Sequence, residues 1–129
     1  MSSFVADTHA IYWQLAEPHR LGRAARRAFA AAEAGKSVCH APAIVLIEIA
    51  LLHERGRVGL SAPQVAGMLA THQAYALLPI DSQQCLEFAA LAGIRDPMDR
   101  MIAAAARVTK TRLVSSDDVF DDYLDRVWE

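Results

Sequence analysis

The feature that most constrains the fold is an alternation of short apolar segments with longer segments of helical pattern. The short segments have the length and composition of buried β-strands. We expect strands over 4–6, 37–41, 75–80 and 113–115, with a possible last strand at 127–128. We expect helices over 8–15, 21–34, 43–55, 62–73, 82–93, 98–108 and 119–124. Strands that alternate with helices imply an α/β fold whose parallel sheet is covered on both faces.

Residues that favour helix starts support this division. Thr8 is a suitable N-cap for the first helix, and Ser61, Asp81 and Asp96 precede the fourth, fifth and sixth. Pro42 is expected in the first turn of the third helix, where a missing N–H costs nothing. The third helix is apolar on nearly every side, which predicts that it is buried.

Length and composition favour one domain over residues 1–129. The hydrophobic fraction of 53% is high, which suggests apolar surface reserved for a partner or a second copy. No apolar run reaches the length of a membrane span, and the chain does not open with a signal-like segment. Cys39 and Cys85 are expected to be buried free thiols, as in a protein of the reducing cytoplasm.

The charged residues are unevenly distributed. The net charge of −2 argues against a general basic coat for nucleic acid, but arginines cluster early in the chain and acids near its end. The early cluster comprises Arg20, Arg23, Arg26 and Arg27. The late one comprises Asp117, Asp118, Asp121, Asp122, Asp125 and Glu129.

Four acidic residues stand at positions that point to a shared site. Asp7 follows the first expected strand and Asp117 the fourth, so a parallel sheet would bring them to the same edge. Asp99 lies in the first turn of the sixth helix, and Glu48 lies inside the apolar third helix, where a carboxylate must be paired, protonated or metal-bound. Each of the aspartates could instead serve as a helix cap or helix-start acid, and Asp118 competes with Asp117 for the fourth place.

Oxygen ligands without cysteine or histidine suit a hard cation such as Mg²⁺ or Mn²⁺. Such ions serve phosphoryl chemistry, because they activate water and stabilise the attacking and leaving oxygens. The expected substrate is therefore a phosphate ester, plausibly a nucleic acid.

Four motifs, in order along the whole chain, resemble those of PIN-domain nucleases, and among these the VapC-type toxins of toxin–antitoxin pairs. They are the segment 4–10 around Asp7, the mid-helix Glu48, the segment 96–106 around Asp99, and the segment 113–117 that ends at Asp117. The resemblance implies a three-layer α/β/α fold with a parallel sheet of four to five strands. It also implies Mg²⁺-dependent RNA cleavage, homodimerisation and inhibition by a small antitoxin protein.

In this interpretation Asp7, Glu48, Asp99 and Asp117 form the acidic quartet. Asp7, Asp99 and Asp117 hold one or two ions, and Glu48 binds metal or positions the attacking water. Ser115 stands where the family often has threonine, and its hydroxyl could still orient a carboxylate or water. The early arginines, or Arg55 and Arg57, would carry the RNA backbone.

Several residues have uses that the sequence leaves open. His9 is expected to contact substrate or to bond locally, and Arg100 to contact phosphate or to pair with an acid such as Asp96. Tyr12, Trp13 and Leu15 are expected in the core or on a surface that receives the antitoxin, rather than in a base-stacking platform.

Two other classes of protein remain as alternatives. A response-regulator receiver also gathers acids around Mg²⁺, but it needs a lysine after a strand, and neither Lys36 nor Lys110 is convincingly placed. A non-catalytic module that only binds a partner would have no reason to bury Glu48.

Overall fold

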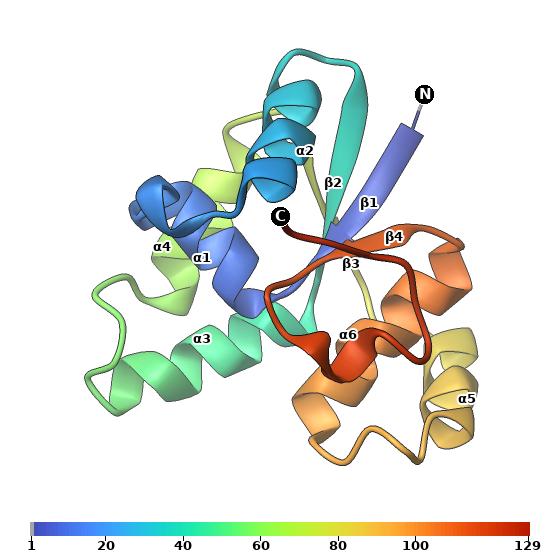
Figure 1. Cartoon of the computed structure of the whole chain (residues 1–129). Helices are drawn as coiled ribbons and strands as arrows, with labels where there is room; N and C mark the ends of the chain where they lie inside the picture. The colour runs from blue at the N-terminus through green and yellow to red at the C-terminus, as the bar shows by residue number, and fades with distance from the viewer. Residues whose placement is uncertain (1) are drawn as a thin grey trace.

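The computed structural model describes residues 2–129, which form a parallel sheet with helices on both faces (Figure 1). The strands are β1 (Ser2–Ala6), β2 (Ser37–Pro42), β3 (Tyr75–Leu78), β4 (Arg112–Val114) and β5 (Arg126–Val127). They lie in the order β3-β2-β1-β4-β5, and every pairing is parallel. The predicted α/β fold is therefore confirmed, with five strands.

Six α-helices connect these strands. They are α1 (Thr8–Ala16), α2 (Arg23–Glu33), α3 (Ile44–Glu54), α4 (Ala62–Ala70), α5 (Ser82–Ala90) and α6 (Pro97–Thr109). Short 3₁₀ turns lie at Pro18–Arg20 and Asp118–Phe120. α1, α2 and α4 lie on one side of the sheet and α5 and α6 on the other (Figure 1). Among residues 2–129, no helix has the length and apolarity needed to cross a membrane.

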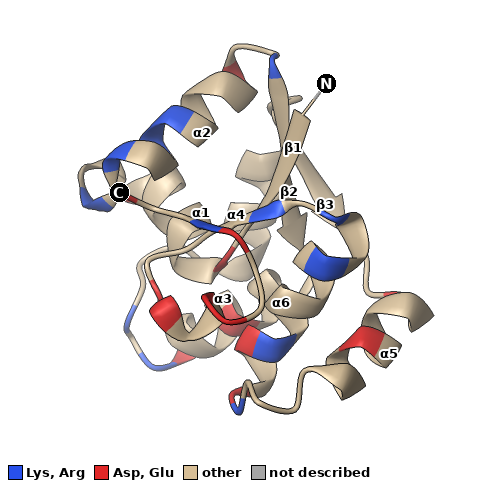
Figure 2. Cartoon of the chain, turned by 45° about the vertical axis from the view of Figure 1, so that its right-hand side comes forward, with Lys and Arg blue, Asp and Glu red and all other residues tan. Residues whose placement is uncertain are grey.

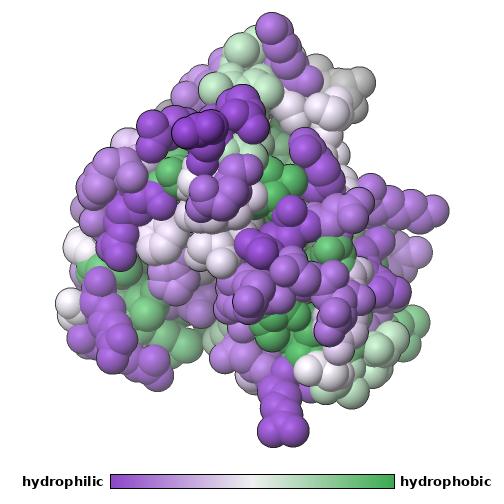
Figure 3. All heavy atoms as spheres, viewed as in Figure 1, coloured by the Kyte–Doolittle hydropathy of each residue, from purple (hydrophilic) through white to green (hydrophobic). Residues whose placement is uncertain are grey.

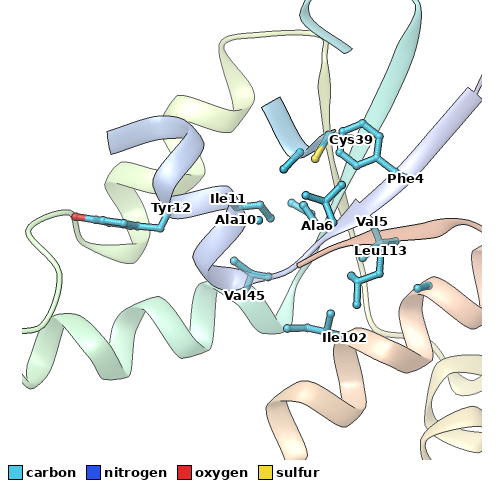
Figure 4. Packing of buried hydrophobic residues seen from close by; sticks show 14 of the residues in the cluster. Phe4, Val5, Ala6, Ala10, Ile11, Tyr12, Cys39, Val45, Ile102 and Leu113 are labelled. Atoms are coloured by element: carbon cyan, nitrogen blue, oxygen red, sulfur yellow. The ribbon is translucent and has the colours of Figure 1, made fainter. Parts of the chain in front are cut away.

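β1 is the central strand, and its side chains are buried on both faces. Phe4, Val5 and Ala6 are buried, and Phe4 meets Phe29 of α2 edge-on with ring centroids 5.6 Å apart. Figure 4 shows Phe4 beside Cys39, with Val5 and Leu113 together near α6. A strand covered on both faces is expected to be apolar throughout, which explains the run Phe4-Val5-Ala6.

α6 packs closely on the sheet and on α5 because the middle of the helix is built from small residues. Residues 103–106 are four consecutive alanines, all buried, and they let the helix backbone approach β1 and β4. The helix begins at the Asp96 cap, whose carboxylate accepts the Asp99 N–H at 3.0 Å. Close packing of α6 fixes where its first turn, with Asp99, stands relative to the end of β1.

Two predicted helix starts were wrong. The N-cap of α1 is Asp7, which accepts the Ala10 N–H at 3.0 Å, and Thr8 is the first helical residue. Pro42 ends β2 instead of opening α3, because its backbone is extended and pairs in register with Leu78. The caps predicted at Ser61 and Asp81 are confirmed.

The third helix and Cys85 were predicted to be buried, and the structure shows that both are partly or wholly exposed. α3 buries only Val45 and Ile49 fully, Ile44 and Leu46 are partly buried against the core, and Ile47 is 49% exposed, so the helix is covered on one side only. Cys39 is buried in β2, whereas Cys85 is exposed on α5. Periodicity cannot tell a buried apolar helix from one whose outer side is exposed.

Candidate active site

A cavity of about 610 Å³ lies at the carboxyl ends of β1 and β4. In the strand order observed, the chain runs outward from β1 through β2 and β3 on one side and through β4 and β5 on the other. Open parallel sheets bind their ligands at such a reversal of strand order. The lining residues are Asp7, Thr8, His9, Trp13, Glu48, Asp96, Asp99, Ile102, Ser116, Asp117 and Asp118.

All four acids predicted from the sequence line this one cavity, although they come from different elements. Asp7 follows β1, Glu48 lies in α3, Asp99 in the first turn of α6, and Asp117 after β4. Figure 2 shows the same gathering, with acidic segments of α3, α6 and the C-terminal loop in the lower middle of the view. α2, by contrast, carries basic residues (Figure 2).

Asp7 is the most buried of the four, at 8% exposed. Its backbone N–H donates to Val114 O at 3.1 Å, and its carboxylate caps α1. Burial raises the pKa of Asp7, whereas hydrogen bonds from Ser115 and from the Ala10 N–H lower it in part. A buried carboxylate with a raised pKa is one that a bound cation would stabilise.

Two hydroxyl groups position acids of this cavity. The buried Thr8 hydroxyl donates to Glu48 across the space between α1 and α3. The Ser115 hydroxyl accepts the Asp117 N–H at 3.0 Å and lies close enough to the Asp7 carboxylate to lower its pKa. The sequence predicted that the Ser115 hydroxyl could orient a carboxylate, but it did not predict the contact of Thr8 with Glu48. The only feature of the sequence that could have indicated this contact is the position of Thr8 directly after Asp7.

The pKa of Asp99 shows how strongly the neighbouring acids repel one another. Its pKa is raised to about 7, first by burial and then by repulsion from Asp96, Asp117, Glu48 and Asp7. All three other members of the quartet are therefore close enough to Asp99 to oppose its ionisation.

Asp117 and Asp118 both line the cavity, so the cavity alone does not choose between them. Asp117 is among the largest sources of the repulsion that raises the pKa of Asp99, and Asp118 is not. Asp117 also accepts the Val119 N–H at 3.0 Å, which fixes its carboxylate after β4. These contacts favour Asp117 as the fourth acid.

Among residues 2–129, no three His, Cys, Asp or Glu side chains converge tightly enough to form a complete ligand set. Unneutralised carboxylates repel one another, so a looser spacing is what electrostatics predicts for the acids alone. The donors are all oxygens on one wall of a polar cavity, and this chemistry suits Mg²⁺ or Mn²⁺.

Another depression, of about 470 Å³, lies between the end of α2 and the segment before β3. It holds one carboxylate, Glu33, which already accepts the Tyr75 hydroxyl at 2.7 Å. Because Glu33 is its only acidic residue, we do not regard this depression as a catalytic site.

The structure shows the positions of Arg100, His9 and Trp13, for which the sequence allowed more than one role. The Arg100 side chain forms no ion pair with Asp96 and does not line the cavity; its guanidinium donates to Ile94 O at 2.7 Å and stacks over Phe88. His9 and Trp13 line the cavity and lie ring against ring, with centroids 5.4 Å apart. Trp13 packs partly against the core, as expected, but its place on the cavity wall was not predicted.

Tyr12 is a core residue. Its ring is buried, and Figure 4 shows its hydroxyl pointing away from the sheet. The hydroxyl accepts the N–H groups of Gly59 and Leu60 at 2.9 and 3.2 Å, which ties α1 to the loop after α3. Tyr12 is therefore not available to line an antitoxin groove.

The comparisons with known proteins agree with this arrangement. The family model of the PIN domain matches residues 4–124. Ribonuclease VapC22 of Mycobacterium tuberculosis (strain ATCC 25618 / H37Rv) is 31% identical over 119 residues, covering 91% of this chain and 88% of that protein.

Solved structures share the fold at lower identity. VapBC2 from Rickettsia felis, bound to a DNA fragment from its promoter, matches with a TM-score of 0.71 and 13% identity over 98% of this chain and 99% of that chain. DNA-bound VapBC from Salmonella typhimurium matches with a TM-score of 0.66 and 18% identity over 98% and 97%. The chain belongs to the PIN domain family and, within it, to the VapC-type proteins.

Proposed function

We propose that this protein is a metal-dependent endoribonuclease, the toxin of a toxin–antitoxin pair, and that residues 1–129 form its single domain. The observation that carries the proposal is the cavity at the reversal of strand order, where four acids from four separate segments meet. Like charges gather in a fold at the expense of stability unless a cation offsets their repulsion. The ribonuclease VapC22 supports RNA as the substrate.

Asp7, Asp99, Asp117 and Glu48 are the residues that would hold Mg²⁺ or Mn²⁺. Such an ion, when bound, supplies an activated water and neutralises charge that develops on phosphorus. Thr8 holds the Glu48 carboxylate in one orientation, and Ser115 links Asp7 to the backbone at Asp117. No nucleophilic side chain is needed, because water activated by the ion can attack the phosphodiester, so hydrolysis is the reaction that the arrangement fits best.

The direct test is cleavage of single-stranded RNA by purified protein, with Mg²⁺, with Mn²⁺ and with EDTA. We expect cleavage with either ion and none in EDTA. Asp7→Asn and Asp99→Asn should each reduce the rate by orders of magnitude, because each removes a charged ligand and keeps the shape. Asp122→Asn is the control, since Asp122 is exposed and lies outside the cavity. Full cleavage by both Asp7→Asn and Asp99→Asn would reject the proposed site.

The receiver alternative is not favoured by the positions of the two lysines. Lys36 precedes β2 and Lys110 precedes β4, so both lie at the amino ends of strands. The acidic cavity lies at the carboxyl ends. A receiver would need a lysine beside the acids, and acetyl phosphate should not phosphorylate this protein.

A small antitoxin protein is the expected partner, because VapBC and other toxin–antitoxin complexes share this fold. Expressed alone, the protein should arrest the growth of its host, and co-expression of the antitoxin should restore growth. Equal arrest by wild type and by Asp7→Asn would show that toxicity does not come from the cavity.

We also propose a homodimer, supported by apolar residues that the fold leaves exposed. Leu86 of α5 is 74% exposed and Ile47 of α3 is 49% exposed. The face seen in Figure 3 is mostly hydrophilic, with hydrophobic atoms only in separate patches. Leu86→Glu should lower the molar mass in light scattering from dimer towards monomer, whereas Gln83→Glu, at another exposed position on α5, should leave it unchanged.

A further inference from the structure

Beside the acids lies a cluster of stacked side chains that the catalytic proposal does not use. We call His9, Trp13, Arg20 and Trp128 the aromatic cluster. The Trp13 ring lies 5.4 Å from His9 and 5.8 Å from Trp128, centroid to centroid, at tilts of 48° and 57°. The Arg20 guanidinium lies over Trp13, 4.7 Å from the ring centroid.

The fold builds this cluster from both ends of the chain. His9 and Trp13 are one turn apart on α1, and Arg20 ends the 3₁₀ turn after it. Trp128 is held beside α2, where its carbonyl accepts the Ala25 N–H at 3.0 Å. Gly22 makes room for this contact, because a Cβ there would collide with the Trp128 carbonyl.

The cluster continues the wall of the acidic cavity. His9 and Trp13 line that cavity together with Asp7, Glu48 and Asp99. Trp13 stands six residues along the chain from Asp7, which corresponds to roughly 9 Å along a helix. A nucleic acid strand whose phosphate lies at the acids would therefore bring a neighbouring base to His9 and Trp13.

The chemistry of the cluster suits an unpaired nucleobase. Bases of single-stranded RNA stack on aromatic rings and on guanidinium planes, and any base can do so. Arg20 is only weakly held in its present position, since its ion pair with Glu17 is 3.6 Å long and its side chain is 51% exposed. An exposed pair of this kind contributes little, so Arg20 is free to turn to a phosphate and to open the Trp13 face.

We propose that the aromatic cluster binds an unpaired base of the RNA next to the phosphate at the acids, and that Trp13 is a substrate-binding residue. This inference rests on the proposed ribonuclease function. It explains why His9 and Trp13 stand on the wall of an acidic cavity and are joined there by Arg20 and, from the far end of the chain, by Trp128.

Intrinsic fluorescence tests the inference directly, because the only two tryptophans of the chain are both in the cluster. The probe is a short single-stranded 2′-O-methyl RNA, which resists cleavage, added in the presence of Mg²⁺. An oligonucleotide of the same length and charge without bases is the control. We expect the first to quench the fluorescence and the second not to, and a Trp128→Phe variant to retain the quenching through Trp13.

Kinetics provide the second measurement. Trp13→Leu should raise KM for single-stranded RNA about tenfold with kcat changed little, and Trp13→Phe should restore most of the loss. Equal quenching by both oligonucleotides, no quenching, or an unchanged KM in Trp13→Leu would overturn the inference. If Trp13→Leu fails to fold, the quenching of wild type decides.

The two proposals fail in different ways. Quenching by the base-containing oligonucleotide without cleavage of ordinary RNA would contradict the ribonuclease and support the base site. Cleavage with unchanged KM in Trp13→Leu would contradict the base site and leave the ribonuclease intact.

Discussion

The hydroxyl of Ser115 accepts a hydrogen bond from the backbone N–H of Asp117 at 3.0 Å. The same hydroxyl lies close enough to the Asp7 carboxylate to lower its pKa, so one buried side chain acts on two of the four acids. β1 and β4 are neighbours in the sheet, and this contact continues their pairing beyond the last strand residues. The relative position of Asp7 and Asp117 is thus set by the sheet and by Ser115.

Ser115→Ala tests this link. The substitution removes the acceptor of the Asp117 N–H and a polar neighbour of the buried Asp7 carboxylate, which should destabilise the protein by about 1–3 kcal/mol. Because that hydroxyl lowers the pKa of Asp7, its loss should raise the pKa further and move the pH profile of cleavage upward. Chemical denaturation and a pH–rate profile measure the two effects. Unchanged stability together with an unchanged profile would show that the hydroxyl has no positioning role.

Thr8→Val tests the second hydroxyl. Valine matches the shape of threonine but cannot donate to Glu48, so cleavage should fall while the fold is retained. Thr8→Ser, which keeps the hydroxyl, is the matched control and should cleave faster than Thr8→Val. The opposite order would mean that packing of the methyl group at this buried position matters more than the hydrogen bond.

Asp117→Asn and Asp118→Asn decide which residue is the fourth acid. Of these two residues, Asp117 is the one among the main sources of repulsion on Asp99, so Asp117→Asn should reduce cleavage by orders of magnitude and Asp118→Asn by much less. The measurement is the initial rate of RNA cleavage at saturating Mg²⁺. A larger loss in Asp118→Asn would exchange their roles.

The pH dependence of stability without metal follows from Asp99. Its pKa is about 7 in the folded protein and 3.8 as the ordinary value, so the folded state holds the proton more tightly. The contribution of Asp99 to the free energy of unfolding is therefore fully present below about pH 4 and is lost as the pH rises through about 7. Thermal melts in EDTA at about pH 5 and about pH 8 should show a smaller decline in Asp99→Asn than in wild type. An equal decline in the two proteins would mean that ionisation of Asp99 is not the source of the pH dependence of stability.

The sheet could be predicted because its signal is local. Short apolar runs such as Phe4-Val5-Ala6 and Leu113-Val114 each precede a helix, and parallel pairing follows from that alternation. The acids could be located for the same reason, since Asp7 and Asp117 directly follow strands whose carboxyl ends meet at one edge. Pro42 was misplaced because proline suits the last residue of a strand as well as the first turn of a helix.

The partners of the acids could not be predicted. The contact of Thr8 with Glu48 joins residues 40 positions apart, and its existence depends on how α1 and α3 cross. Trp13 likewise meets Trp128 only because the end of the chain passes over α2 beside Gly22. Periodicity gives the exposure of a side chain on its own element, but not which distant element covers it.

We propose that the acidic cavity is a metal site with Asp99 among its ligands. Mg²⁺ should bind only the folded state, because the ligands are far apart in the sequence. At a hundred times its dissociation constant it should stabilise the protein by about 2.7 kcal/mol. For a domain of this size this corresponds to a rise of about 10 °C in melting temperature.

Four melting curves at neutral pH measure metal binding at the cavity: wild type and Asp99→Asn, each with EDTA and with excess Mg²⁺, at one protein concentration. Asp99→Asn removes one repelling charge, so without metal it should melt above wild type, and Mg²⁺ should raise its melting temperature much less. Equal Mg²⁺ shifts in the two proteins would contradict the assignment of Asp99 as a ligand, and no shift in either would contradict the metal site itself.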